Sequence, residues 1–167
     1  MSARENASAG PRVTLDRFAG RGGKYTLVTL PHLRQQPLRM SENTVLLVED
    51  NPDNRDIYGT FLRHYGFTVV EAEDGAEGVR LAREFLPGVI LMDVGLPLLD
   101  GLEATRLLKA DPATADIPVV ALTAHAMESD RQAAFDAGCD AYLAKPAEPS
   151  RVLEMVRSLM PVGAGGA

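Results

Sequence analysis

Five side chains of this sequence have the chemistry to hold a divalent metal ion beside a phosphoryl group. They are three acids, one hydroxyl and one ammonium group, namely Glu49, Asp50, Asp93, Thr123 and Lys145. Four of them stand where an apolar run typical of a strand ends, and Lys145 comes shortly after such a run. In an open parallel sheet, ligand-binding groups gather outside the carboxyl ends of the strands. We therefore expect all five side chains along one edge of a sheet.

The three acids suit Mg²⁺, because carboxylates are hard oxygen ligands and three negative charges held close together repel one another without a cation. We expect Lys145 to pair with Asp93 at rest and with a phosphoryl oxygen during reaction, while Thr123 offers a hydroxyl donor to the same oxygens. Neither a Ser-His-Asp triad nor a glycine-rich phosphate loop is evident, so Asp93 is the candidate nucleophile. A simpler interpretation is that acids merely open the loops after strands.

Strand and helix patterns alternate along the chain from Thr44 onward. Short apolar runs rich in Val, Leu and Ile predict strands buried on both faces, and Asn-Pro, Asp-Gly and Gly signals mark helix ends. The predicted strands span residues 45–48, 67–72, 89–92, 117–122 and 139–143. The predicted helices start at Asn51 and Asp74 and span residues 102–109, 124–137 and 152–160. This alternation predicts a doubly wound α/β fold with five parallel strands and five helices.

Length and composition limit what kind of protein this chain can be. With 167 residues, 46% of them hydrophobic, it can hold one domain with a real core and is short for two. Residues 41–167 carry ten Lys and Arg against 21 acids, which disfavours a nucleic-acid partner. No apolar run reaches the length of a membrane span, so we expect no membrane partner. The single cysteine, Cys139, argues against a disulfide framework and predicts a cytoplasmic protein.

The first forty residues differ from the rest of the chain in charge. Residues 1–40 carry seven Lys and Arg against two acids, with Gly and Pro among them, so we expect a disordered basic N-terminal extension over residues 1–42. Two alternatives are that translation begins at Met40 and that the segment is an organelle transit peptide. We expect the folded domain over residues 43–162 and a short disordered tail over residues 163–167.

Four groups of residues, in order along the chain, resemble the motifs of a known family. They are Leu-Val-Glu-Asp-Asn (residues 47–51), Leu-Met-Asp (91–93) followed by Leu-Pro and by Asp100-Gly101, Ala-Leu-Thr-Ala (121–124) and Ala-Lys-Pro (144–146). With these motifs, residues 43–162 resemble the CheY-like receiver domain of two-component response regulators. The resemblance implies a flavodoxin-like sheet of order 2-1-3-4-5. It also implies Mg²⁺-dependent phosphotransfer from a histidine kinase or a histidine phosphotransfer protein.

The same resemblance implies the residues of a metal and phosphorylation site. Asp93 would accept the phosphoryl group, Asp50 and Asp93 would bind Mg²⁺ directly, and Glu49 would bind it through water. The backbone carbonyl of Gly95 would be the remaining protein ligand. Gly95 has no side chain to orient an attacking water, and His125 lies near the other position that tunes autodephosphorylation in the family. The lifetime of the phosphoryl group is therefore left open.

The resemblance further implies a switch. Thr123 and Tyr142 match the pair of residues that respond to phosphorylation, and Lys145 matches the lysine of the family. The peptide bond before Pro146 resembles one usually found cis. Phosphorylation would move Thr123 toward the phosphoryl group, let Tyr142 rotate inward and repack the surface around residues 125–160 for a downstream protein partner.

The resulting hypothesis is a single-domain response regulator that signals by protein contact. It is expected not to be an enzyme, apart from its own phosphorylation and slow autodephosphorylation. Within the family, residues 123–127 and 138–142 resemble most the cell-cycle type called DivK, and chemotaxis-like signalling or a phosphorelay intermediate are alternatives. A Mg²⁺-dependent aspartate-nucleophile phosphohydrolase is the alternative from the enzyme class, but such enzymes carry a second acid where this chain has Gly95. A phosphorylation-independent binding module is disfavoured because the acids, Thr123 and Lys145 are all present.

Overall fold

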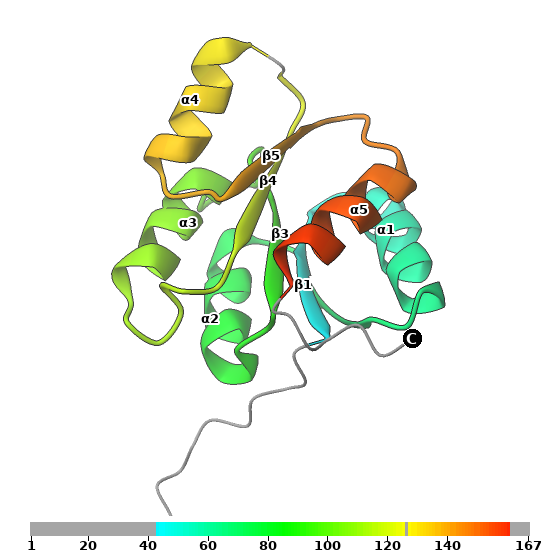
Figure 1. Cartoon of the computed structure of the whole chain (residues 1–167). Helices are drawn as coiled ribbons and strands as arrows, with labels where there is room; N and C mark the ends of the chain where they lie inside the picture. Colours follow the sequence, from blue (N-terminus) through cyan, green and yellow to red (C-terminus); the bar gives the residue numbers. More distant parts are fainter. Residues whose placement is uncertain (1–42, 126, 161–167) are drawn as a thin grey trace, which may run out of the picture. The chain divides into compact units, whose positions relative to one another are not determined.

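A computed structural model describes residues 43–125 and 127–160 of the chain. Strands and helices alternate throughout this part (Figure 1), as the sequence predicts. The strands are β1 (Thr44–Val48), β2 (Thr68–Ala72), β3 (Val89–Asp93), β4 (Val119–Thr123) and β5 (Ala141–Ala144). The helices are α1 (Pro52–His64), α2 (Gly75–Phe85), α3 (Gly101–Ala110), α4 (Glu128–Asp136) and α5 (Pro149–Leu159).

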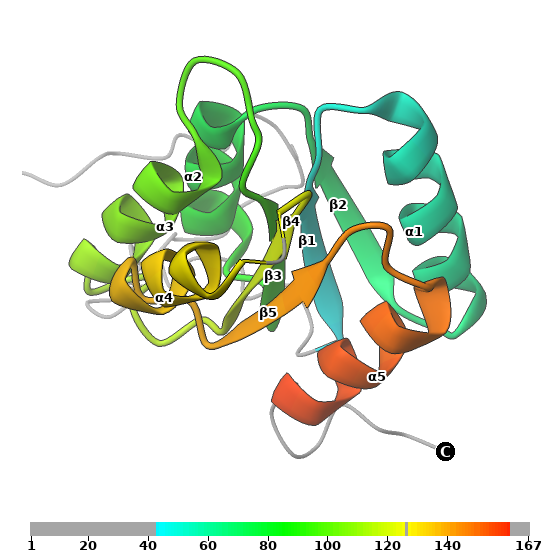
Figure 2. The same ribbon diagram turned by 90° about the horizontal axis from the view of Figure 1, so that it is seen from above.

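The five strands form one parallel sheet in the order β2-β1-β3-β4-β5, which confirms the predicted order. Helices α1 and α5 cover one face of the sheet, and α2, α3 and α4 cover the other (Figure 2). The strand order reverses at β1, so the chain leaves β1 toward one face and leaves β3 toward the other. The loops that follow these two strands therefore lead to opposite faces of the sheet, and in open α/β sheets ligands bind at such a switch point.

Two apolar layers, one on each face of the sheet, hold the fold together. Leu46 and Ile90 belong to the layer that includes residues of α2, α3 and α4. Leu47 and Leu91 belong to the opposite layer, which includes residues of α1 and α5. Every residue of β1, β3 and β4 is buried, because successive side chains point to opposite faces and both faces are covered. Since each large buried side chain contributes about 1.5–3 kcal/mol, the ends of these strands are firmly placed.

Three helices begin at capping side chains close to this edge of the sheet. Asn51 Oδ1 accepts hydrogen bonds from the backbone N–H groups of Asp53 at 2.9 Å and Asn54 at 3.2 Å, at the start of α1. Asp74 caps α2, and Asp100 caps α3. A cap of this kind contributes about 1 kcal/mol. The caps fix where the loops after β1, β2 and β3 end, and so limit how far the acids on those loops can move.

The structure corrects some predicted boundaries. Helix α4 begins at Glu128, four residues after the predicted start, because the Thr123 hydroxyl bonds to both the N–H and the carbonyl of His125 and holds this segment as a turn. Helix α5 begins at Pro149, three residues earlier than predicted, in line with the preference of proline for the first helical turn. Strands β4 and β5 each begin two residues later than predicted.

None of the helices formed by residues 43–125 and 127–160 is long and apolar enough to cross a membrane. The predicted basic extension over residues 1–42 and the tail over residues 163–167 lie outside the described residues, as does the end of the predicted domain at residues 161 and 162. The domain boundaries therefore stay a prediction.

Candidate functional site

The carboxyl ends of β1 and β3 bring three acids together. Asp93 is the last residue of β3, and Glu49 and Asp50 directly follow β1. Because β1 and β3 are neighbours in the sheet, one carboxylate oxygen of each acid lies within 4.8 Å of the others. Glu49 and Asp93 are buried, whereas Asp50 is exposed. The acids that the sequence singles out thus form one cluster, which is open to solvent at Asp50.

Both carboxylate oxygens of Asp93 have a polar partner. The N–H of Gly95 donates to Oδ1 at 2.9 Å, and Lys145 Nζ lies 3.0 Å from Oδ2. The ion pair that we expected between Lys145 and Asp93 is therefore present. These two contacts fix the orientation of a side chain that is itself only 7% exposed.

Lys145 also makes a contact that the sequence did not predict. Its Nζ donates a hydrogen bond to Glu49 Oε2 at 2.6 Å, so one ammonium group bridges two acids. Burial disfavours the charged form of Lys145, but the hydrogen bonds to Glu49 and Asp93 outweigh it and hold the pKa of Lys145 above its ordinary value of 10.5. For Glu49, burial raises the pKa of the carboxyl despite the bond from Lys145, and the neighbouring Asp93 charge adds to the rise.

The donor set of the cluster fits a small, hard cation. Glu49 is fully buried, Lys145 divides its charge between two acids, and Asp50 makes no ion pair within residues 43–125 and 127–160. A divalent cation would offset the excess negative charge. Mg²⁺ prefers carboxylate oxygens and keeps several waters, for which the exposed side of Asp50 leaves room. The residues present therefore fit Mg²⁺, and the carbonyl of Gly95 stays a predicted ligand.

Two hydroxyl groups converge on one backbone carbonyl at the end of β4. Thr123 is buried, and its Oγ1 donates to the carbonyl of His125 and accepts from the N–H of His125, both at 3.2 Å. Tyr142 on β5 donates its hydroxyl to the same carbonyl at 2.6 Å. The predicted switch pair is thus connected through the backbone of His125. From the sequence, only the side chain of His125 was considered, whereas the contacts in the structure are made by its backbone.

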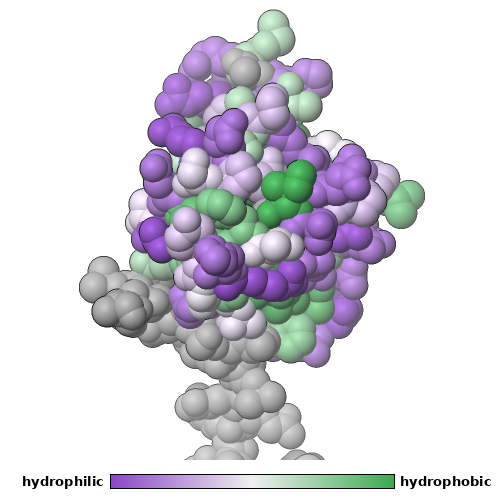
Figure 3. Space-filling model, turned by 90° about the vertical axis from the view of Figure 1, so that its right-hand side faces the viewer, coloured by the Kyte–Doolittle hydropathy of each residue, from purple (hydrophilic) through white to green (hydrophobic). Residues whose placement is uncertain are grey.

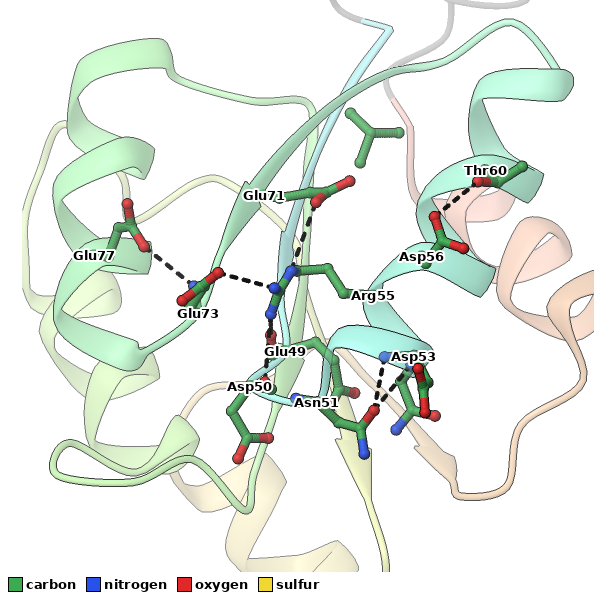
Figure 4. A network of polar contacts seen from close by, with 12 residues as sticks. Glu49, Asp50, Asn51, Asp53, Arg55, Asp56, Thr60, Glu71, Glu73 and Glu77 are labelled. Carbon is green, nitrogen blue, oxygen red and sulfur yellow. Dashed lines mark hydrogen bonds and ion pairs between the residues drawn. The ribbon is translucent and has the colours of Figure 1, made fainter.

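Arg55 was not identified from the sequence, yet its guanidinium group lies against the loop between β1 and α1 that carries Glu49 and Asp50, here called the acidic loop (Figure 4). Nη1 donates to the backbone carbonyl of Glu49 at 2.8 Å and lies 3.4 Å from that of Asp50. Nη2 donates to Glu73 at 2.9 Å. One signal was available: Arg55 stands near the N-terminus of α1, where a basic side chain opposes the helix dipole and needs another reason to be present.

A side chain of α1 forms a hydrogen bond with the loop after β5. The bond between Lys145 and Pro146 is cis, as the resemblance implies, and the buried Tyr58 of α1 donates its hydroxyl to the carbonyl of Ala147 at 3.2 Å. Figure 3 shows the side of the domain on which α1 and α5 lie in Figure 1. Hydrophilic residues cover most of it, with hydrophobic residues between them. Through its hydrogen bond to Ala147, Tyr58 links helix α1 on this side of the domain to the segment that carries Lys145.

Known proteins resemble this chain in sequence. A family model described as the response regulator receiver domain matches residues 45–157. The polar-differentiation response regulator DivK of Brucella anthropi is 38% identical over 117 residues, which cover 70% of this chain and 95% of that protein. DivK proteins of Brucella ovis and Brucella suis match with the same identity and coverage.

Solved structures resemble the fold. The receiver domain of a sensor histidine kinase from Pseudomonas aeruginosa, which has a magnesium ion coordinated in its active-site cleft, matches with a TM-score of 0.66 and 38% identity over 70% of this chain and 96% of that chain. The chemotaxis protein CheY4 of Vibrio cholerae matches with a TM-score of 0.67 and 26% identity over 70% of this chain and 97% of that chain. The magnesium ion in the first structure agrees with the cation that the acids of this chain fit.

Proposed function

We propose a function from one premise: this chain belongs to the family of response regulator receiver domains. Its DivK relatives are named as response regulators, which are signalling proteins of two-component systems. We infer that it accepts a phosphoryl group on Asp93 from a histidine kinase or a histidine phosphotransfer protein and signals by contact with another protein. The observation that carries the proposal is the cluster of Glu49, Asp50 and Asp93 within 4.8 Å, with Lys145 paired to Asp93 at 3.0 Å.

The proposed reaction is a direct transfer to the carboxylate of Asp93. One carboxylate oxygen attacks phosphorus, and a new O–P bond forms while the N–P bond to the donor histidine breaks and the imidazole leaves with the bonding electrons. Mg²⁺ bound by Glu49, Asp50 and Asp93 would supply positive charge to the phosphoryl oxygens. The ammonium group of Lys145, already 3.0 Å from Asp93 Oδ2, can pair with a phosphoryl oxygen as Asp93 loses its own charge.

The proposed signal leaves the site through Thr123 and Tyr142. A phosphoryl group on Asp93 brings new acceptor oxygens, which compete with the carbonyl of His125 for the Thr123 hydroxyl. Movement of Thr123 would alter the position of His125, whose carbonyl is also the partner of the Tyr142 hydroxyl. The result would be a shift between two populations, in which Tyr142 turns inward and the surface around residues 125–160 is repacked.

The surface proposed for the downstream partner comprises α4, β5 and α5, within residues 125–160. Met127 and Phe135 are exposed hydrophobic residues there, and interface cores are enriched in such side chains. The acidic balance of residues 41–167 supports a protein partner and not nucleic acid or a membrane. We further propose that the protein acts in the cytoplasm, where its single cysteine stays reduced.

Two relatives with the same identity support different places in signalling. DivK of Brucella anthropi, at 38%, supports a regulator of polar differentiation that passes the signal to an output partner. The receiver domain of the Pseudomonas sensor kinase, also at 38%, supports a relay in which Asp93 passes the phosphoryl group to a second histidine. We propose the first, because residues 123–127 and 138–142 resemble the DivK type. Rapid transfer from Asp93 to a histidine phosphotransfer protein, with no effect on any output partner, would favour the relay.

The decisive experiment is incubation with Mg²⁺ and a small phosphodonor such as acetyl phosphate, followed by intact mass spectrometry. We expect one phosphoryl adduct that is labile in both acid and base, as an acyl phosphate is. The adduct should be absent from Asp93→Asn and present on Asp116→Asn. Asp116 is a matched control because it is an exposed acid in the loop before β4, at the opposite end of that strand from the site.

This experiment, together with an assay of phosphate release, distinguishes the alternatives. An adduct that persists on Asp93→Asn, or no adduct on the wild-type chain with Mg²⁺ present, would overturn the proposal. Continuous release of phosphate from several phosphate monoesters would instead favour the Mg²⁺-dependent phosphohydrolase.

A further inference from the structure

We propose that Arg55 is a positioning residue that holds the loop between β1 and α1 in the shape needed to bind Mg²⁺. This inference rests on the proposed function, because it concerns the two acids of that loop, Glu49 and Asp50. Arg55 acts on the backbone of these acids and not on their carboxylates. It is therefore not a metal ligand, and its effect on the metal is indirect.

The contacts of Arg55 begin where the sheet stops supporting the chain. The N–H of Glu49 still bonds to the carbonyl of Ala72 in β2 at 3.1 Å. The carbonyl of Glu49 instead accepts from Arg55 Nη1 at 2.8 Å, and the same nitrogen lies 3.4 Å from the carbonyl of Asp50. Arg55 thus continues the role of a neighbouring strand for the residues that carry the two acids.

Arg55 is itself held in a fixed orientation. Nη2 donates to Glu73 Oε1 at 2.9 Å, and Nε lies 3.6 Å from Glu71 Oε2 (Figure 4). The N–H of Glu73 donates in turn to Glu77 Oε2 in α2 at 3.1 Å. The Arg55 side chain is only 14% exposed, whereas Glu73 is 71% exposed, so water screens the outer ion pair more than it reaches the guanidinium group. A planar guanidinium fork held on several sides has one preferred orientation.

Whether Arg55→Ala weakens or tightens Mg²⁺ binding shows whether Arg55 acts by positioning the loop or through its charge. Arg55→Ala would leave Glu71 and Glu73 without this cation, and Coulomb attraction alone then predicts tighter Mg²⁺ binding. Loss of the loop geometry predicts weaker binding, because groups that orient metal ligands from outside typically change the affinity by about 10- to 100-fold. We expect the geometric effect to win, because Arg55 bonds directly to the loop backbone at 2.8 Å, whereas the charges it would leave behind are weakened. Glu73 is 71% exposed to screening by water, and Glu71 keeps its ion pair with Arg63.

Arg63 provides a matched control on the same helix. Its Nη2 lies 2.6 Å from Glu71 Oε1 and 3.3 Å from the carbonyl of Val69. Within residues 43–125 and 127–160, Arg63 makes no hydrogen bond to the acidic loop. Arg63→Ala therefore removes the same charge and an ion pair to one of the same acids, while the loop stays supported.

The experiment is a calorimetric titration of the full chain with MgCl₂ at neutral pH. Thermal unfolding of each variant first identifies a temperature at which all are folded. We expect Arg55→Ala to bind Mg²⁺ about tenfold more weakly than the wild type, and Arg63→Ala to bind it with wild-type affinity. Arg55→Lys keeps the charge but replaces the fork by a single ammonium group, so its affinity should lie between those of Arg55→Ala and the wild type. It also serves as the test if Arg55→Ala does not fold.

Three results would overturn the inference. They are unchanged or tighter binding in Arg55→Ala, an equal loss in Arg63→Ala, and full wild-type affinity in Arg55→Lys. Each of them leaves phosphorylation of Asp93 in the wild-type chain untouched. Failure of the proposed function would instead show as a wild-type chain that takes up no phosphoryl group.

Discussion

At the scale of single residues, Gly95 leaves one side of Asp93 open. A Cβ atom placed on Gly95 would lie 3.6 Å from Asp93 Oδ1, an ordinary van der Waals distance, so a side chain fits there. Gly95→Asn would place an amide beside the phosphoryl group, where it can orient an attacking water. We expect autodephosphorylation to become about tenfold faster, measured as the decay of the mass adduct after removal of the phosphodonor.

Gly95→Ala is the matched control, because it fills the same space without adding a polar group. We expect its phosphoryl lifetime to stay close to that of the wild type. Equal lifetimes in the Asn and Ala variants would show that the missing side chain does not set the rate of hydrolysis.

Tyr58 makes the stability of the domain depend on pH in the alkaline range. Burial raises the pKa of Tyr58 above its ordinary value of 10.0. The folded protein therefore keeps the phenol proton at a pH where the unfolded chain loses it, so stability falls as the pH rises above that value. At neutral pH we expect Tyr58→Phe to lose about 1 kcal/mol of unfolding free energy with the hydrogen bond. This difference from the wild type should shrink above about pH 10.

Urea unfolding of the wild type and of Tyr58→Phe, at neutral pH and again above about pH 10, measures the difference in unfolding free energy between the two proteins. Other titrating groups contribute equally to the two proteins and cancel. A stability difference that stays constant from neutral to alkaline pH would contradict the assignment of the effect to Tyr58.

The residues that could be predicted from the sequence are those whose own chemistry marks them. Glu49, Asp50 and Asp93 are acids at the ends of apolar runs, and the sheet brings them within 4.8 Å. Arg55 could not be placed in the same way, because its partners in the acidic loop are backbone carbonyls. Every residue has such a carbonyl, so no pattern of residue types shows which one a distant side chain binds.

At the scale of elements, the order of strands and helices could be predicted, but some boundaries could not. An apolar run such as Val89–Met92 is long enough to predict a buried strand, and its alternation with helices then predicts a parallel sheet. The start of α4 depends instead on the bonds of Thr123 to the backbone of His125. These bonds compete with the backbone hydrogen bonds of a helix, and the apolar pattern of the segment does not predict them.

The contact between α3 and β3 admits only glycine at the first position of the helix. A Cβ atom on Gly101 would lie 2.0 Å from the carbonyl oxygen of Asp93, so backbone would have to shift against backbone. We expect Gly101→Ala to lower the free energy of unfolding by about 1–3 kcal/mol, measured by urea denaturation. Because the shift would fall on Asp93, phosphorylation should slow as well.

Gly95→Ala again serves as the comparison, since its Cβ would meet no atom closer than 3.6 Å. We expect its stability to change by less than about 1 kcal/mol. Equal losses in Gly101→Ala and Gly95→Ala would mean that the close approach of α3 to β3 relaxes at little cost.

At the scale of the whole domain, the cluster of acids at the site destabilises the folded state that brings the acids together. The two apolar layers stabilise the sheet from both faces, while folding also gathers Glu49, Asp50 and Asp93 at one edge. Lys145 pairs with Glu49 and Asp93, and Asp50 has no ion-pair partner in the part of the chain that the structure describes. The repulsion among the acids is therefore only partly offset, and a bound cation should stabilise the whole domain.

A ligand that binds only the folded state adds about 2.7 kcal/mol when its concentration is 100 times its Kd. We therefore expect MgCl₂ to raise the midpoint of thermal unfolding, and NaCl at equal ionic strength to leave it nearly unchanged. Asp50→Asn should lose most of this Mg²⁺-dependent rise. Without Mg²⁺, the same variant should be at least as stable as the wild type, because one repelling charge is gone. If Asp50→Asn kept the full rise with MgCl₂, the stabilising cation would have to bind away from the cluster.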